Sequence, residues 1–406
     1  MRSLIFFILT ITLSLPATSR ASDEIDQIRA QLMALLERVE SLEAENQQLR
    51  VEVKQTAERT DAVAVSTESK RNWTNTIAVS GDLRARYESF DIDDRDDRER
   101  SRVRARLTVK AKPTDNTEVG IGLASGGDDP VSTNQTLGGG ASTKDVRLDL
   151  AYFKWQVKPG LTLTGGKSKN PFFRPGGNGL LWDGDLRHEG LSLAYSGDSI
   201  FLNTGLHFLE SDTKRSNARI AYGFQSGYKS QIGASKLTAG LGYFKISAAG
   251  QSSWYDEDFF GNTVSCAGDT CVYANDFNEL ELFAELKTIV RDQPLTLFAD
   301  YVQNQEASDN DTAWALGFKF GKAGNPKTWE LGYTYQDIEA DAVIGLWSDS
   351  DFAGGDTDAK GHILRGAWAP SKKWKIGLTY FINETGVELG DGNDYNRLQL
   401  DWAYKF

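Results

Sequence analysis

The sequence is poor in the residues and runs that mark several common classes of protein. Two cysteines and three histidines in 406 residues leave little from which to build a four-ligand zinc site. The longest apolar run, residues 4–15, is shorter than the roughly 20 residues that a membrane-spanning helix needs. Acidic residues outnumber basic ones by 57 to 45, for a net charge of −12, which excludes a protein whose whole surface binds nucleic acid.

Common enzyme motifs are missing as well. The tetrapeptide at 165–168 ends in Gly-Lys-Ser like a phosphate loop, but Leu161 stands where that loop needs its first glycine. Neither an HExxH nor a GxSxG motif is present, and the three histidines are scattered at His188, His207 and His362. The charged run 91–100 lacks the glycine and final glutamate of a calcium loop. We therefore predict no cofactor and no metal site, with a hydrolase inside a barrel as the least favoured alternative.

The chain begins like an exported protein. A basic residue, an apolar run over 4–15 and small residues ending at Ala21 form the layout of a secretory signal peptide, residues 1–21. An uncleaved N-terminal anchor is the alternative interpretation. In an oxidising compartment Cys266 and Cys271, which flank a Gly-Asp turn, are expected to form a local disulfide.

Residues 22–60 have the spacing of a coiled coil. Steps of three and four residues separate the apolar positions over about four heptads. These positions are Ile25, Ile28, Leu32, Leu35, Val39, Leu42, Leu49 and Val53, and Asn46 occupies the one core position that is not apolar. A single amphipathic helix packed on a domain would show a wider stripe, so self-association is favoured over that reading. A polar linker is expected over 61–73.

From residue 74 to residue 406 the apolar period changes from that of a helix to two, which is the period of half-buried strands. Sixteen strands are expected, beginning near residues 77, 100, 118, 145, 161, 188, 200, 218, 236, 278, 295, 312, 328, 361, 374 and 395. Short connections follow the even-numbered strands and long ones follow the odd-numbered strands, as in outer-membrane barrels. Trp155, Trp329, Trp368, Trp374 and Trp402 fall at the ends with short turns, as expected of an aromatic girdle. The fold class predicted is all-β, a transmembrane antiparallel barrel, over a soluble sandwich or β-helix.

Four segments resemble the putative-porin family of Gram-negative bacteria: GDLRARYE (81–88), RERSRVRARL (98–107), DPVSTNQTLGG (129–139) and KSKNPF (167–172). The resemblance implies a signal peptide, a short periplasmic coiled coil, a barrel in the outer membrane and passive channel activity. The last residues, LQLDWAYKF, resemble the C-terminal signal read by the barrel-insertion machinery, with Phe406 as its terminal aromatic.

Basic residues alternate with apolar ones along the first two strands. An arginine on the lipid face at mid-membrane costs about 2–4 kcal/mol, so these side chains are expected to line the pore: Arg84, Arg86, Arg102, Arg104 and Arg106, with Arg147 extending the row. Such a row attracts anions. The alternative, left open, is that it is neutralised by Asp82, Glu88, Asp145 and Asp149.

The long connection 167–190 is rich in glycine, proline and aromatic residues. Such a loop should be packed rather than free in water, and we expect it to fold inward and narrow the pore. Packing against a neighbouring subunit is the alternative. The residues expected at the constriction are Phe172, Phe173, Arg174, Trp182, Asp183 and Asp185.

Together these features predict a porin for small hydrophilic solutes or ions. Its expected partners are outer-membrane lipid, lipopolysaccharide and two further copies of itself, although a core asparagine is also compatible with a dimer. No nucleic acid is expected. A structural protein that tethers the envelope through the coiled coil is the alternative function.

Overall fold

The structure is a computed structural model that describes residues 20–74, 76–211 and 219–406. The chain divides into two compact units, with the boundary between Asn72 and Trp73. The predicted signal peptide lies almost wholly outside the described residues, and its cleavage stays a prediction.

The described part of the first unit is helical: it belongs to one long helix, α1 (Arg20–Thr74), whose last two residues fall beyond the boundary. Its apolar heptad positions from Leu32 to Val53 are exposed. No helix in the described part of the chain is long and apolar enough to cross a membrane. The helix differs from expectation at its C-terminal end, because it continues through residues 61–73, where a linker was predicted. That segment contains no glycine or proline to stop a helix, and alanine, glutamate and lysine favour its continuation.

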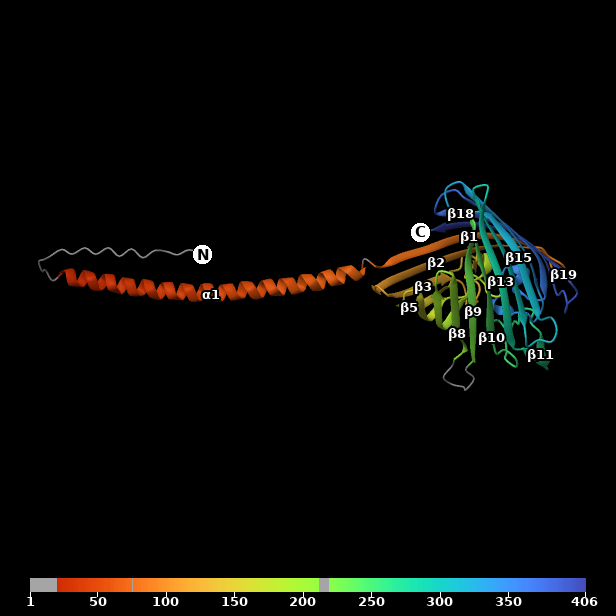
Figure 1. Cartoon of the computed structure of the whole chain (residues 1–406), viewed down its shortest axis with the longest axis horizontal. Coiled ribbons are helices and arrows are strands. Elements are labelled where there is room, and N and C mark those ends of the chain that lie inside the picture. The colour runs from red at the N-terminus through yellow and green to blue at the C-terminus, as the bar shows by residue number, and fades with distance from the viewer. Residues whose placement is uncertain (1–19, 75, 212–218) are drawn as a thin grey trace. The chain divides into compact units, whose positions relative to one another are not determined.

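The second unit is a closed barrel of sixteen long antiparallel strands, so the predicted fold class is confirmed (Figure 1). Each strand pairs with its neighbours, and β1 pairs with β19 to close the sheet. The strands are β1 (Ala78–Ile92), β2 (Arg98–Thr114), β3 (Thr117–Ser125), β5 (Val146–Lys158), β6 (Leu161–Lys169), β7 (Arg187–Ser196), β8 (Ile200–Glu210), β9 (Arg219–Ile232), β10 (Ser235–Ile246), β13 (Phe277–Val290), β14 (Gln293–Asn304), β15 (Thr312–Gly321), β16 (Thr328–Ile338), β17 (Ala359–Ala369), β18 (Trp374–Thr385) and β19 (Asn393–Lys405). Each begins within two residues of its predicted start.

Three short strands complete the sheet structure. β4 (Gln135–Thr136) pairs with β2. β11 (Val264–Ala267) and β12 (Thr270–Tyr273) form a separate hairpin. The structure contains a disulfide between Cys266 and Cys271, which face each other across this hairpin.

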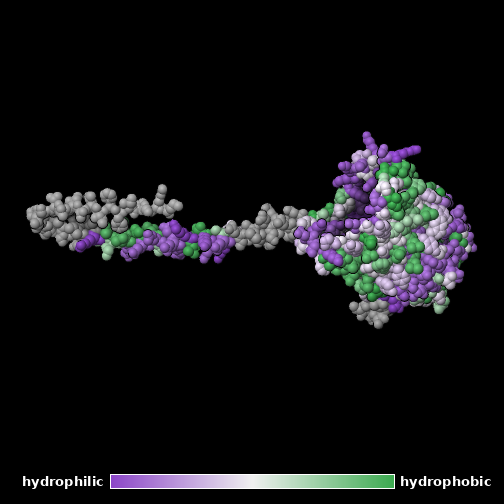
Figure 2. Space-filling model, in the orientation of Figure 1, coloured by the Kyte–Doolittle hydropathy of each residue, from purple (hydrophilic) through white to green (hydrophobic). Residues whose placement is uncertain are grey.

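The outer face of the barrel is apolar. Leu83, Leu107, Ile121, Leu282 and Leu331 are all exposed on it, and Figure 2 shows hydrophobic residues gathered over the strands of the face in view. The tryptophans near the short turns are also exposed: Trp155, Trp329, Trp368, Trp374 and Trp402. An exposed apolar wall with tryptophans near one rim suits a bilayer and its interface.

The core lies inside the barrel, where long loops pack against the inner wall. The loop 170–186 contains the turn η1 (Pro175–Gly177), and the loop 339–358 contains η2 (Gly345–Trp347) and η3 (Phe352–Gly355). Their buried side chains contact one another and residues of the wall; the loop members include Leu180, Leu181, Trp182, Val343, Ile344, Leu346 and Phe352. These two loops bring polar side chains to the inner faces of β1 and β2.

Candidate functional site in the barrel interior

Strands β1 and β2 place their arginines opposite one another. In the register Arg84 faces Arg104 and Arg86 faces Arg102, while Leu83 and Ala105 pair on the opposite face of the sheet. Because side chains alternate along a strand, all five arginines of the two rows share the inner face. Like charges directly opposite each other destabilise a sheet, so this pairing requires nearby carboxylates.

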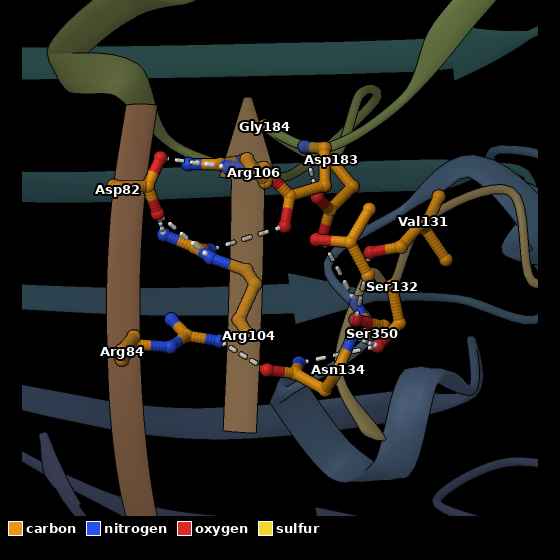
Figure 3. A network of polar contacts seen from close by, with 12 residues as sticks. Asp82, Arg84, Arg104, Arg106, Val131, Ser132, Asn134, Asp183, Gly184 and Ser350 are labelled. Atoms are coloured by element: carbon orange, nitrogen blue, oxygen red, sulfur yellow. Dashed lines mark hydrogen bonds and ion pairs between the residues drawn. The ribbon is translucent and has the colours of Figure 1, made fainter. Parts of the chain in front are cut away.

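Asp82 and Asp185 supply two of these carboxylates. Asp82 lies 2.9 Å from both Arg104 and Arg106, and Asp185 lies 2.7 Å from Arg106 and 3.4 Å from Arg104. Figure 3 shows Arg104 and Arg106 projecting from β2 toward Asp82 on one side and the loop 170–186 on the other. The loop is thus joined to the barrel wall by charge-assisted hydrogen bonds, which are stronger than neutral ones.

A second group of ion pairs joins the loop 339–358 to the wall. Arg86 forms a bidentate pair with Asp401, at 2.7 and 2.9 Å, and also lies 2.9 Å from Asp351. Arg397 contacts Asp351 at 2.7 Å and donates to Glu88. Arg397 and Glu88 have side-chain exposures of 2% and 0%, so their charges depend on each other rather than on water.

The remaining predicted arginines have different surroundings. Arg84 donates to the side-chain oxygen of Asn134 at 2.6 Å and lies 3.7 Å from Asp401. Arg102 donates to the backbone oxygen of Asn134 at 3.4 Å and takes part in none of the ion pairs found in the described residues. Arg147 lies apart from both rows, in a largely exposed pair with Asp145.

The loop carboxylates divide into two pairs with opposite pKa shifts. Burial disfavours ionisation of Asp185, but Arg104 and Arg106 outweigh it and hold the pKa of its carboxyl below the ordinary value. Burial is outweighed in the same way at Asp351, whose pKa is held well below the ordinary value by Arg397 and Arg86. Burial and a neighbouring carboxylate instead raise the pKa of Asp183 and that of Asp349.

This ion-pair network contains more arginines than carboxylates. In the described part of the chain its pairs involve seven arginines: Arg84, Arg86, Arg100, Arg104, Arg106, Arg187 and Arg397. They involve six carboxylates: Asp82, Glu88, Asp149, Asp185, Asp351 and Asp401. Seven minus six leaves an excess of one arginine in the network, and Arg102 and Asp129 lie beside it outside any ion pair of the described residues.

The predicted constriction loop is held across the interior by hydrogen bonds to strands far apart in the sequence. The backbone N–H of Phe173 donates to Gln225 on β9 at 2.7 Å, and that of Gly176 donates to Glu285 on β13 at 2.9 Å. Asn178 donates to Asp300 on β14 at 2.9 Å. Contacts with β2, β9, β13 and β14 together require the loop to cross inside the barrel.

Aromatic packing fixes the ends of the same loop. Phe172 stacks on Trp182 with ring centroids 5.6 Å apart and meets Phe244 of β10 edge-on at 4.7 Å. Arg174 donates to the backbone oxygen of Trp182 at 2.8 Å. Asp183 makes no arginine pair within ion-pair distance in the described residues; it accepts the backbone N–H groups of Asp185 and Ser350.

Sequence reasoning did not identify Asp351, Asp401, Arg397 or Asn134 as members of the site. Arg397 and Asp401 had a detectable signal, because they alternate with the apolar residues of the last predicted strand. Asp351 and Asn134 lie in loops, where no period shows which way a side chain points.

The histidines form no recognisable catalytic arrangement. His188 and His207 lie against each other with ring centroids 3.9 Å apart, and none of their ring nitrogens has a hydrogen-bond partner in the described residues. His362 contacts the hydroxyl of Tyr333 at 2.8 Å. Within the described ranges no group of three or more histidine, cysteine or acidic side chains is arranged to hold a metal ion.

The closed barrel, its apolar outer wall and its charged interior define a transmembrane channel of the outer-membrane type. The sequence matches the model of the putative porin family over residues 90–279 and 263–406. The chain therefore belongs to that family: it is an outer-membrane porin of a Gram-negative bacterium. A comparison with curated proteins found no match.

Solved structures share the fold. OprB of Pseudomonas putida, in its high-pH structure, aligns with a TM-score of 0.56 at 12% identity, over 85% of this chain and 97% of that one. OmpF of Salmonella typhi, in a complex with daunomycin, aligns with a TM-score of 0.50 at 11% identity, over 81% and 97%. At these identities the likeness concerns the fold alone.

Proposed function

We propose that this porin carries out passive diffusion of small hydrophilic solutes and ions, with a preference for anions, and has no catalytic turnover. The observation that carries the preference is the excess of arginines, seven against six carboxylates, in the ion-pair network of the wall and the two inner loops. Fixed positive charge on the wall of a narrow aqueous path raises the local concentration of anions and lowers that of cations. The raised pKa values of Asp183 and Asp349 reduce how far these two carboxyls offset that charge.

The proposal places the loop 170–186 at the narrowest part of the path. Its hydrogen bonds to three strands and its ion pairs with Arg104 and Arg106 on β2 support this placement. The path then runs between Asp185 and the arginine rows. Arg147 borders a cavity of about 620 Å³ whose lining also includes Asp185 and Arg187.

Reversal potentials in a salt gradient test the anion preference. The purified full-length protein is placed in planar bilayers, and the wild type is compared with a variant in which Arg102, Arg104 and Arg106 are changed to Ser. We expect the variant to lose its anion preference, because three positive charges are removed from the wall. Arg95→Ser, in the exposed turn 93–97, is the matched control. An unchanged ion preference in the triple variant would contradict the proposal, and a wild type without conductance would contradict channel activity itself.

We also propose that the porin is a homotrimer held together partly by α1. The exposed apolar positions of the helix, with Asn46 at one core position, support self-association because a lone helix would leave them in water. Deletion of residues 25–60 should leave a folded, conducting barrel that crosslinks less efficiently into trimers. If the deletion instead detaches the membrane from the cell wall while permeability and trimer content stay the same, the envelope-tethering function is favoured.

A further inference from the structure

A small cavity lies beside Arg102, on the inner side of β2. Its volume is about 190 Å³. It is bordered by β2, by the loop that follows β3 and by the loop 339–358, through residues that include Arg100, Arg102, Asp129, Ser132, Ser350 and Asp351. The cavity is large enough for an ion of a few heavy atoms and smaller than the roughly 300–1,000 Å³ of sites for drug-sized molecules.

Arg102 makes no ion pair in the described residues, although Asp129 lines the same cavity. Its neighbours in the cavity are already engaged: Arg100 pairs with Glu88, and both oxygens of Asp351 are taken by Arg86 and Arg397. In the described residues Arg102 has one long hydrogen bond, at 3.4 Å, and its buried Nε has no partner. A guanidinium with free donors matches the paired oxygens of an oxyanion.

Ser132 provides a second donor. Its hydroxyl oxygen accepts hydrogen bonds from the backbone N–H of Asn134 and from the Asn134 side chain. Its own proton is therefore available to an acceptor in the cavity. Ser132 is buried, at 7% exposure, so an acceptor there would replace water rather than compete with bulk solvent.

Asp129 adds a carboxyl group to the lining of the cavity. One of its oxygens accepts the backbone N–H of Val131 at 2.9 Å. Burial raises the pKa of this carboxyl, although Arg102 acts in the opposite direction. In its ionised form this carboxylate repels a ligand that offers only acceptor oxygens. It accepts a hydrogen bond from a ligand that keeps an O–H group.

We propose that the cavity is a binding site for inorganic phosphate, held by Arg102 and Ser132 and distinguished from sulfate by Asp129. Phosphate near neutral pH keeps at least one O–H group to donate, whereas sulfate is fully ionised. This inference deepens the proposed function, on which it rests, because it assigns a particular solute class to the anion-leaning path. Binding is non-covalent and reversible, so phosphate slows the flow of chloride while it occupies the site.

Block of the chloride current tests the site in the full-length channel. Potassium phosphate or potassium sulfate is added at matched ionic strength and neutral pH, and the concentration for half-maximal block is measured. Phosphate should block the wild type at lower concentration than sulfate. Arg102→Gln should raise the phosphate concentration needed by about tenfold, as expected for the loss of charge-assisted hydrogen bonds. Arg95→Gln, in an exposed turn, should behave as wild type, and Asp129→Asn should bring the values for phosphate and sulfate together.

The outcomes separate the two proposals. Equal block by phosphate and sulfate in a conducting wild type, or equal phosphate block in Arg102→Gln and Arg95→Gln, overturns the phosphate site and leaves the porin function standing. A wild type that does not conduct overturns the proposed function. In that case binding of isotope-labelled phosphate to the detergent-solubilised full chain still decides on the site. Heat-modifiable gel migration shows whether each variant is folded.

Discussion

Replacing Asp185 with asparagine should make the channel more selective for anions. Arg104 and Arg106 each lie within 4 Å of Asp185 and of Asp82. In the described residues these are the two carboxylates that pair with them. Asn keeps the shape of the side chain and removes one negative charge. The positive charge of the two arginines is then offset by Asp82 alone.

The size of the effect follows from the charge removed. One unit charge acts on an ion about 7 Å away with about 0.6 kcal/mol in water. At about 0.1 M salt, with a Debye length of about 10 Å, screening roughly halves this energy. The change has opposite signs for an anion and a cation, so the two effects multiply. The ratio of anion to cation permeability should therefore rise about threefold.

Reversal potentials in a KCl gradient measure this ratio, and Asp183→Asn provides the matched control. Asp183 lies in the same loop, but burial and Asp349 raise the pKa of its carboxyl, so the same substitution removes less charge. Its expected shift is smaller than that of Asp185→Asn. At about 1 M KCl, where the Debye length is about 3 Å, both variants should approach the wild type. An unchanged ratio in Asp185→Asn, or an equal shift in Asp183→Asn, would refute this electrostatic reasoning.

Two further predictions concern the inner loops. Because the pKa values of Asp185 and Asp351 are lowered, their ion pairs contribute their full stability at pH values above the ordinary pKa of 3.8. This stability is lost as the pH falls through the lowered pKa values. Circular dichroism should therefore show a lower unfolding temperature below pH 3.8, and the decrease should be smaller in Asp185→Asn. Gly176→Ala should displace the constriction loop and change single-channel conductance, because its Cβ would come within 2.2 Å of the Phe298 ring. Gly177 has a similar positive φ, but a Cβ there would meet no atom closer than 3.7 Å, so a channel with Gly177→Ala should conduct normally. Equal conductance of the two variants would show that the contact between position 176 and the wall does not set the position of the loop.

The barrel was predictable because its pattern is set by the bilayer. A strand between lipid and water must alternate apolar and polar side chains, and each residue's position along the chain then decides its side. Arg84 and Arg104 could thus be assigned to one face with Leu83 on the other. The long and short connections alternate for the same reason, since the two ends of the barrel face different compartments.

The sequence by itself therefore determined the sixteen strands, the face on which each side chain lies and the presence of a glycine-rich loop after β6. The tertiary structure alone decided which charges meet, because ion pairs such as Arg86–Asp351 and Arg397–Glu88 join residues more than 260 positions apart. It also placed the loop 339–358 beside the arginine rows and left Arg102 outside the ion pairs of the described chain. A loop follows no period, and its direction is set by the anchors that it finds on distant strands.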